Sequence, residues 1–299
     1  MCPLDAVAYL CDRPLRHSTS GDRMGIYATA HLRRMRGGAQ AHLVEASDGN
    51  HYVVKPQNNA QHRRVLVNEW VSAVILERLD LSMPPAAIVH FTEDFISAHP
   101  ALTVQTGTSQ RPVMPGRHFG SRFPGDPARL AVFDYLPDAV LTTVTNLAEF
   151  KGALVFDKWV SNSDSRQAIF FRARLKKWSD PEAHGNRMGL VALMIDNGYA
   201  FNGPQWDFPE SPVQGMYFRK LVYDGVRNLD DFQPWLDRVR FFPEEYIDEA
   251  YRRVPPEWID GEEDDFEKLL ESLLKRRKRV PDLIESCRSA TSAPFPNWE

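Results

Sequence analysis

Residues Asp157–Phe171, with the sequence DKWVSNSDSRQAIFF, contain a polar break between apolar stretches. The break, Asn162–Gln167, precedes a strand-like run and predicts a loop held between regular elements. A second apolar run, Leu190–Ile195, predicts a strand that pairs antiparallel with the first. This pairing would bring Asp196, in the segment LMIDNGYAF, near Asp164. The sequence therefore predicts two neighbouring carboxylates, and the alternative is that both aspartates only cap turns.

The composition is that of an ordinary folded protein. The 299 residues are 43% hydrophobic and 25% charged, which allows a sizeable core in one domain or two lobes. A formal net charge of -4 gives no general attraction to nucleic acid or to anionic membranes, so neither is an expected partner. The cysteines, Cys2, Cys11 and Cys287, lack metal-site spacing and indicate a reducing cytoplasm. We find no export signal and no membrane-spanning run.

A glycine pair precedes the first clear strand, in the sequence Gly37-Gly38-Ala39-Gln40. Glycine tolerates positive φ, so this turn could direct backbone N–H groups at phosphates, although a plain hairpin turn is an equal explanation. The runs Ala41–Ala46 and His51–Lys55 are joined by an Asp-Gly turn and predict a β-hairpin. The hairpin would carry the Lys55 ammonium toward whatever the glycine turn binds.

A helix is predicted next, over Val65–Leu81, and it ends before Pro84-Pro85. Glu69 would share one face of this helix with apolar side chains. An inward carboxylate needs a cationic partner, because an unpaired buried charge costs several kcal/mol. Lys55 is the nearest candidate, and the alternative is a solvated Glu69 at the helix rim.

The middle of the chain predicts a boundary between two lobes. The passage Ala98–Asp126 is rich in Gly, Ser, Thr and Pro and predicts a long surface loop, with Arg117 and His118 exposed. Residues Leu130–Leu136 predict an apolar strand that Pro137 ends. We therefore expect an N-terminal lobe over residues 1–136 and a C-terminal catalytic lobe over residues 137–299.

The second half predicts mostly helices. Residues 138–160 predict two helical pieces, with Asn146 as a cap candidate, and the polar insert Lys176–Met188 predicts a loop between the two central strands. An apolar stripe in Glu262–Leu274 indicates packing. The basic run Lys275–Arg279 predicts a solvated helix end, with binding of nucleic acid or an acidic partner as the alternative.

The order of these features is that of the parts of a kinase. Phosphoryl transfer needs a cation on the phosphates, a carboxylate beside the attacking hydroxyl and ligands for magnesium. Lys55 braced by Glu69 would supply the cation. Asp164 would orient or deprotonate the hydroxyl, and Asp196 would hold Mg²⁺. We therefore expect ATP and Mg²⁺ as ligands.

Five segments of the chain resemble the HipA-like kinases, relatives of the phosphoinositide-kinase-like atypical kinases. These segments are RGGAQAHLV (Arg36–Val44), VVKPQ (Val53–Gln57), NEW (Asn68–Trp70), NSDSRQAIFF (Asn162–Phe171) and MIDNGYAF (Met194–Phe201). The resemblance implies an α+β, two-lobed protein-kinase-like fold, with an antiparallel-sheet N-terminal lobe and a mostly helical C-terminal lobe.

The resemblance also implies roles for individual residues. Gly37, Gly38, Ala39 and Gln40 would form the phosphate loop, and Lys55 and Glu69 the ion pair. Asp164 would be the catalytic aspartate and Asp196 a metal ligand. The hinge strand that carries adenine would consist of Val132, Phe133, Asp134, Tyr135 and Leu136.

The chain departs from the family pattern in two places. The family's catalytic loop follows the pattern Asp-x-His-x-x-Asn. In this chain Arg166 stands at the His position, and no Asn follows five residues after Asp164. Gln167, or alternatively Asn162, would have to replace the second metal ligand. Residues 1–35 leave no room for the additional N-terminal subdomain of typical members, so a toxin role is not expected.

The sequence thus predicts ATP- and Mg²⁺-dependent phosphoryl transfer to a hydroxyl group. The favoured acceptor is a protein Ser or Thr, including residues of the kinase itself, and a small molecule is the alternative. The altered loop leaves open a nucleotide-binding pseudokinase that acts as a regulatory interaction module. A metal-dependent hydrolase that uses Asp164 and Asp196 would leave Lys55 and Glu69 unexplained.

Overall fold

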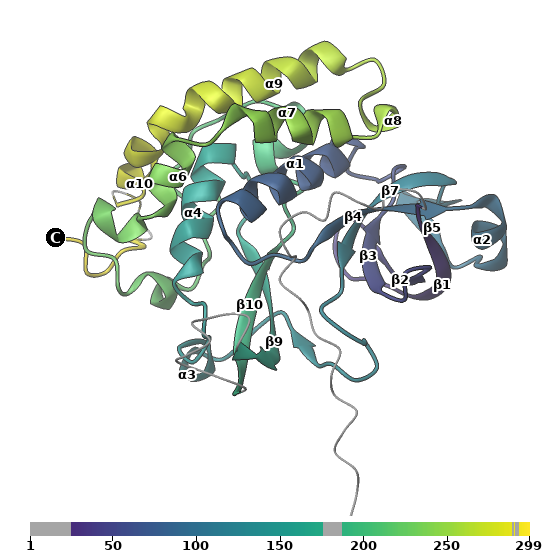
Figure 1. Ribbon diagram of the computed structural model, residues 1–299, viewed down its shortest axis with the longest axis horizontal. Helices are drawn as coiled ribbons and strands as arrows, with labels where there is room; N and C mark the ends of the chain where they lie inside the picture. Colours follow the sequence, from purple (N-terminus) through teal and green to yellow (C-terminus); the bar gives the residue numbers. More distant parts are fainter. Residues whose placement is uncertain (1–24, 176–186, 289, 291–292) are drawn as a thin grey trace, which may run out of the picture.

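The computed structural model describes residues 25–175, 187–288, 290 and 293–299. Figure 1 shows a β-rich N-terminal region beside a mostly helical C-terminal region, with the β9–β10 hairpin next to their junction. The predicted α+β, two-lobed architecture is confirmed. Among the described residues, no helix combines the length and the apolar character needed to cross a membrane.

The N-terminal region is a closed barrel with the strand order β1-β2-β3-β7-β4. Its strands are β1 (Ile26–Arg34), β2 (His42–Ala46), β3 (His51–Lys55), β4 (Ala86–Phe91) and β7 (Gly116–Arg122). The β1–β4 pair is parallel and the other pairs are antiparallel. The predicted hairpin is present as β2 and β3, in which His42 lies opposite Val54. Strand β1 was not predicted.

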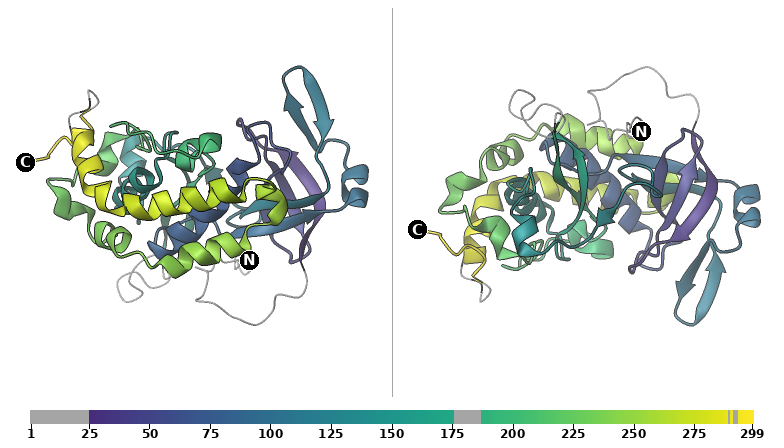
Figure 2. Two further views of the ribbon diagram at one scale, coloured as in Figure 1. Left: turned by 90° about the horizontal axis from the view of Figure 1, so that it is seen from above. Right: turned by 90° about the horizontal axis from the view of Figure 1, so that it is seen from below.

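The prediction of a surface loop over Ala98–Asp126 was wrong. This passage contains β7, an inner strand of the barrel, and the hairpin of β5 (Thr103–Thr106) and β6 (Ser109–Pro112), which projects from the barrel in Figure 2. Strand β7 resembles a loop in composition partly because it contains Gly120, which allows close packing against β4. A Cβ at Gly120 would lie 2.6 Å from Cγ2 of Val89. His118 is buried rather than exposed, and Arg117 pairs with Glu257.

Helix α1 (Arg64–Arg78) joins the two regions. It was predicted in nearly this span, and it contacts α7 (Glu244–Arg253) and α8 (Pro256–Ile259) of the C-terminal region. Buried residues of α1 such as Leu66 and Val71 belong to the same apolar core as residues of the C-terminal helices. The division at residue 137 therefore stays a prediction, because this core crosses it.

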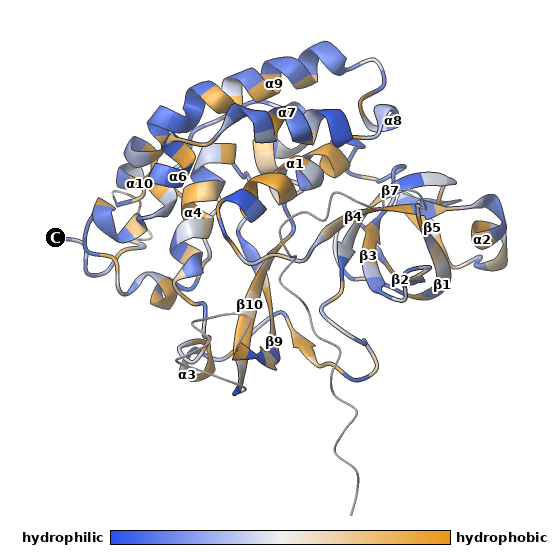
Figure 3. Ribbon diagram, viewed as in Figure 1, coloured by the Kyte–Doolittle hydropathy of each residue, from blue (hydrophilic) through white to orange (hydrophobic). Residues whose placement is uncertain are grey.

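The C-terminal region packs helices around α4 (Glu149–Val160), which is almost entirely buried. The other α-helices of the described chain are α2 (Glu93–Ala98), α3 (Asp138–Leu141), α6 (Trp235–Arg240), α9 (Glu263–Arg276) and α10 (Val280–Arg288). Short 3-10 helices lie at η2 (Ala200–Gln205), η3 (Lys220–Tyr223), η4 (Leu229–Phe232) and η5 (Arg277–Arg279). The predicted stripe of α9 is buried at Phe266, Leu269, Leu270 and Leu273, and Figure 3 shows this helix as mostly hydrophilic with hydrophobic bands.

Of two further predictions for this region, one was wrong. Asn146 does not cap α4, which begins after Ala148. Its side chain instead exchanges two hydrogen bonds with the backbone of Ala192, at 2.9 and 2.8 Å. The basic run Lys275–Arg279 lies at the C-terminal end of α9, as predicted, with Lys275, Lys278 and Arg279 exposed, and four of its side chains form ion pairs with carboxylates. The pairs are Lys275–Glu271, Arg276–Glu210, Arg277–Glu244, Arg279–Glu210 and Arg279–Asp282.

The central sheet has the order β10-β9-β8. Strands β9 (Gln167–Arg174) and β10 (Met188–Ile195) pair antiparallel, so the predicted pairing is confirmed. The strand predicted over Leu130–Leu136 is reduced to β8 (Val132–Phe133), because only these two residues pair with β9. Of the predicted loop Lys176–Met188, residues 176–186 lie outside the described residues, and Met188 belongs to β10.

Candidate active site

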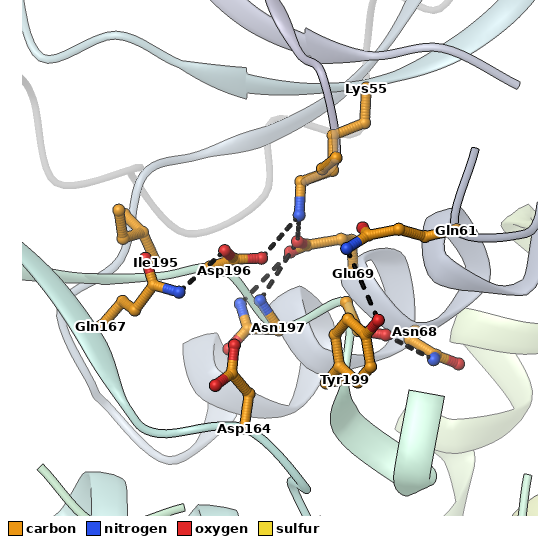
Figure 4. A network of polar contacts seen from close by, with 12 residues as sticks. Lys55, Gln61, Asn68, Glu69, Asp164, Gln167, Ile195, Asp196, Asn197 and Tyr199 are labelled. Carbon is orange, nitrogen blue, oxygen red and sulfur yellow. Dashed lines mark hydrogen bonds and ion pairs between the residues drawn. The ribbon is translucent and has the colours of Figure 1, made fainter. Parts of the chain in front are cut away.

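Lys55 ends strand β3 with its ammonium between two carboxylates (Figure 4). Nζ forms an ion pair with Oε1 of Glu69 and lies 2.8 Å from Oδ1 of Asp196, so the predicted contact with Glu69 is present. Glu69 is only 3% exposed, which excludes the solvated alternative. Burial by itself lowers the pKa of the Lys55 ammonium, but the charges of Glu69 and Asp196 outweigh burial and raise this pKa. Lys55 therefore remains a cation at neutral pH.

The segment Asp196–Gly198 contacts this ion pair through three successive residues. Asp196 has a φ of 59°, and the charge of Lys55 lowers the pKa of its carboxyl group against the opposing effect of burial. Asn197 donates to Glu69 through its backbone N, at 3.1 Å, and through Nδ2, at 3.4 Å. A Cβ on Gly198 would lie 2.6 Å from Cγ1 of Val65 and 3.4 Å from Nζ of Lys55, so glycine permits this close approach.

Helix α1 holds the chain that follows Asp196 through a residue that sequence reasoning missed. Asn68 is fully buried, and its Nδ2 donates to the carbonyl oxygens of Gly198 and Gly203 at 2.8 and 3.0 Å. Its Oδ1 accepts from Nε1 of Trp206 at 2.8 Å. Its sequence position gave no clear signal, because residues next to each other on a helix face different directions.

Asp164 lies on the loop between α4 and β9. Asn162 Oδ1 accepts from the backbone N of Asp164 at 3.2 Å, and the Asp164 carboxylate accepts from the N of Ser165 at 2.7 Å. The side chain of Asp164 is exposed and so remains accessible to a substrate. The register that pairs Ile195 with Gln167 places the loop of Asp164 and the segment of Asp196 at the same end of the hairpin, as predicted.

The two candidates for a second metal ligand differ in their surroundings. Gln167 is exposed, and its Nε2 donates to Oδ2 of Asp196 at 3.0 Å. Asn162 is fully buried, and its Nδ2 donates to Asp157 at 2.9 Å while its Oδ1 binds the backbone of Asp164. Gln167 is therefore the candidate that contacts Asp196.

The glycine turn connects β1 to β2. Gly37 has a φ of 112°, the carbonyl oxygen of Ala39 accepts from Nδ2 of Asn59 at 2.9 Å, and a Cβ on Gly38 would lie 2.7 Å from Nε2 of Gln61. The Gln40 side chain instead bonds to the backbone of Gln105, at 2.6 and 2.7 Å. Gln40 thus fastens the turn to β5.

The predicted hinge strand lies at the edge of the central sheet. Phe133 pairs with Phe170, three residues along β9 from Gln167, which is roughly 10 Å at the usual rise of a strand. Asp134 and Tyr135 are exposed, and Leu136 is buried. The guanidinium of Arg219 lies over the Tyr135 ring and donates to the Leu136 carbonyl oxygen at 2.9 Å, which fixes the hinge to the C-terminal region.

Comparison with protein families finds one match within the chain. Residues 30–172 match the HipA-like kinase family. This stretch is similar to the HipA-like kinases. It contains the glycine turn, Lys55, Glu69 and Asp164, and the predicted resemblance is confirmed. Asp196 lies beyond the match, so its assignment depends on the contacts described above.

Several solved structures of kinases are remotely similar to this chain. Two structures of the Golgi casein kinase, one of them with Mn/ADP bound, each have a TM-score of 0.46, with 10% and 11% identity. The alignments cover 89% and 90% of this chain and 72% and 74% of that chain. The Helicobacter pylori proinflammatory kinase CtkA has a TM-score of 0.42 and 11% identity over 88% of this chain and 97% of its own. No site residue is assigned from these structures. Comparison with curated protein sequences gives no significant match.

Proposed function

We propose that the HipA-like region and the helices behind it catalyse ATP- and Mg²⁺-dependent phosphoryl transfer to a hydroxyl group, with protein Ser/Thr as the acceptor, including residues of the chain itself. The observation that carries this proposal is the position of Lys55, whose ammonium is shared by Glu69 and Asp196. A lysine held by a helix carboxylate offers a fixed positive charge to phosphates, beside a carboxylate suited to a hard divalent cation.

In this proposal Asp164 acts on the acceptor. The acceptor oxygen forms a bond to the γ-phosphorus, the bond from that phosphorus to the ADP oxygen breaks, and the Asp164 carboxylate accepts the hydroxyl proton. Lys55 stabilises the negative charge on the departing diphosphate. The backbone of the glycine turn, at Gly37, Gly38, Ala39 and Gln40, covers the phosphates, and the hinge at Phe133–Leu136 binds adenine.

The donor set around Asp196 fits a magnesium ion that binds together with nucleotide. Within the described residues, no group of three or more His, Cys, Asp or Glu side chains could hold a metal ion. Mg²⁺ commonly takes one or two carboxylates and completes its shell with substrate phosphates and water. We assign Asp196 as the carboxylate ligand and the amide oxygen of Gln167 as the second protein ligand. When bound, the ion neutralises charge on the phosphates.

The test is Mg²⁺-dependent ATP turnover and autophosphorylation in the wild type and in three variants. Asp164→Ala and Asp196→Ala should each lower turnover by at least about a hundredfold, the scale expected for loss of a group that acts on the transferred proton or phosphate. Asp94→Ala is the matched control, because Asp94 is an exposed aspartate on α2, at the far side of the barrel. It should leave turnover unchanged.

Two other results would reject kinase activity. Stabilisation of the wild type by nucleotide without any turnover would identify a pseudokinase. This outcome is tested because Arg166 and Gln167 depart from the catalytic-loop pattern of the family. Turnover that depends on metal but not on nucleotide identity would identify a hydrolase. Either result is distinguishable from a kinase that has lost activity through misfolding, because the thermal unfolding of each variant is measured in parallel.

A further inference from the structure

Arg166 fills a buried space between α4, the loop of Asp164 and the end of β10. Its Nε donates to Oδ2 of Asp157 at 2.8 Å, and its Nη2 pairs with Oδ1 of the same carboxylate. Its Nη1 donates to the carbonyl oxygen of Ile195 at 2.9 Å and to Oδ1 of Asn197 at 3.0 Å. Both side chains of the ion pair are buried, and every nitrogen of the guanidinium has an acceptor.

The two acceptors of Nη1 flank Asp196. Asp196 adopts a φ of 59°, in the left-handed region that is costly for a residue with a side chain and that persists only where the surroundings enforce it. Arg166 binds the carbonyl oxygen of Ile195, the residue before Asp196, and the side-chain amide oxygen of Asn197, the residue after Asp196. Asn197 is held in turn by Glu69, so Arg166 also connects to the ion pair of Lys55.

The other end of Arg166 is fixed to the loop of Asp164. The carboxylate of Asp157 accepts from Nδ2 of Asn162, and Asn162 accepts from the backbone N of Asp164. One guanidinium thus lies between the two segments that carry the predicted catalytic carboxylates. A lysine could keep the charge next to Asp157, but a single ammonium lacks the planar fork that spans a carboxylate and two further acceptors.

We propose that Arg166 is the positioning residue for Asp196, and that it holds this carboxylate in the place where a divalent cation binds together with nucleotide. The inference rests on the proposed function. Stability alone does not explain the arrangement, because a buried ion pair can often be replaced by apolar side chains of similar volume without loss of stability. The contacts to residues 195 and 197 would be lost in such a replacement.

The experiment measures binding of Mn²⁺, a paramagnetic probe for carboxylate and phosphate sites, by electron paramagnetic resonance in the presence of a non-hydrolysable ATP analogue. Arg166→Lys should weaken Mn²⁺ binding by about 10-fold to 100-fold, the usual effect of removing a group that orients a metal ligand. Affinity for the analogue without metal should change by less than about twofold, because Arg166 is assigned no contact with nucleotide.

A second variant separates position from stability. Asp157→Leu/Arg166→Met replaces the ion pair by apolar side chains and so leaves no unpaired buried charge; where it remains folded, it should bind Mn²⁺ as weakly as Arg166→Lys. Arg277→Lys is the matched control, because Arg277 also binds one carboxylate and two carbonyl oxygens, but does so among the C-terminal helices. It should bind Mn²⁺ with wild-type affinity.

The outcomes distinguish this inference from the proposed function. If the folded Asp157→Leu/Arg166→Met variant, or folded Arg166→Lys, binds Mn²⁺ as the wild type does, the positioning role is refuted while the proposed function stands. If the wild type itself binds no Mn²⁺ with the analogue, both proposals fail. High Mn²⁺ concentration should restore turnover of Arg166→Lys toward the wild-type value, and a deficit that persists at metal saturation would also contradict a role limited to positioning.

Discussion

Replacement of Lys55 by methionine would remove the cation that two carboxylates share. Glu69 is 3% exposed, so its charge would be left in the core with no ammonium beside it. Breaking a buried ion pair by removing one partner costs about 3–5 kcal/mol. The side chain of Asp196 is 34% exposed, and it adds less because water screens its charge. We therefore expect Lys55→Met to lower the free energy of unfolding by about 3–5 kcal/mol.

The double variant Lys55→Met/Glu69→Gln tests the cause of this loss. It removes both charges of the pair, so it should recover most of the stability that Lys55→Met loses, even though it carries one more substitution. Lys275→Met is the control for loss of a lysine from an ion pair, because Lys275 is 77% exposed beside Glu271. This exposed change should alter the free energy of unfolding by no more than about 0.5 kcal/mol.

Urea unfolding followed by tryptophan fluorescence measures all three variants, without nucleotide or metal, so the result does not depend on catalysis. The reasoning is refuted if Lys55→Met is as stable as the wild type, since the carboxylates would then not depend on the lysine. It is also refuted if the double variant is no more stable than Lys55→Met, because the cost would then come from lost packing rather than from an unpaired charge.

Two further predictions concern packing and pH. Gly198→Ala should lower the free energy of unfolding by about 1–3 kcal/mol through overpacking, since its Cβ would meet Cγ1 of Val65 at 2.6 Å. Gly225→Ala is the control, because its Cβ would meet nothing within 4 Å, and it should leave the thermal unfolding temperature nearly unchanged. Equal effects of the two substitutions would contradict the packing argument. Burial lowers the pKa of His118 to about 3 and that of His42 to about 4, whereas an unfolded histidine titrates near 6.5. The unfolded chain therefore binds more protons below pH 6.5, and each histidine should lower stability by about 1.4 kcal/mol per pH unit as the pH falls from about 6 toward 4. In urea unfolding measured across this range, His118→Gln should remove one histidine's share of the slope, and an unchanged slope would exclude His118 as its source.

The sequence predicted best what depends on short-range patterns. The hairpin that carries Lys55 follows from alternation around an Asp-Gly turn, and the inward direction of Glu69 follows from helical periodicity. The pairing of β9 with β10 follows from two apolar runs on either side of a polar insert. In each case the pattern that determines the element lies within the element or beside it.

Strand β7 shows why the barrel could not be predicted in full. Its pairing with β3 and β4 joins residues far apart in the sequence, and its composition of glycine, serine, arginine and histidine is typical of loops. The strand is stabilised by close approach at Gly120 and by the partners of Arg117, which lie on another lobe. Propensity therefore favours the wrong state, and only the tertiary contacts correct it.

The asparagines of the site illustrate a different limit. A sequence shows that Asn68 and Asn197 stand beside predicted functional carboxylates, but an amide can donate and accept in several directions, and its buried partners depend on how distant segments pack. The left-handed backbone of Asp196 has only a weak local signal, since aspartate adopts this conformation more often than most residues but far less often than glycine. Its conformation follows from contacts of its two neighbours with Arg166 and Glu69, and from the bond between Asn68 and Gly198. The position of this carboxylate is therefore a property of the assembled network, and substitutions at its supporting residues should alter ligand binding without touching the ligand.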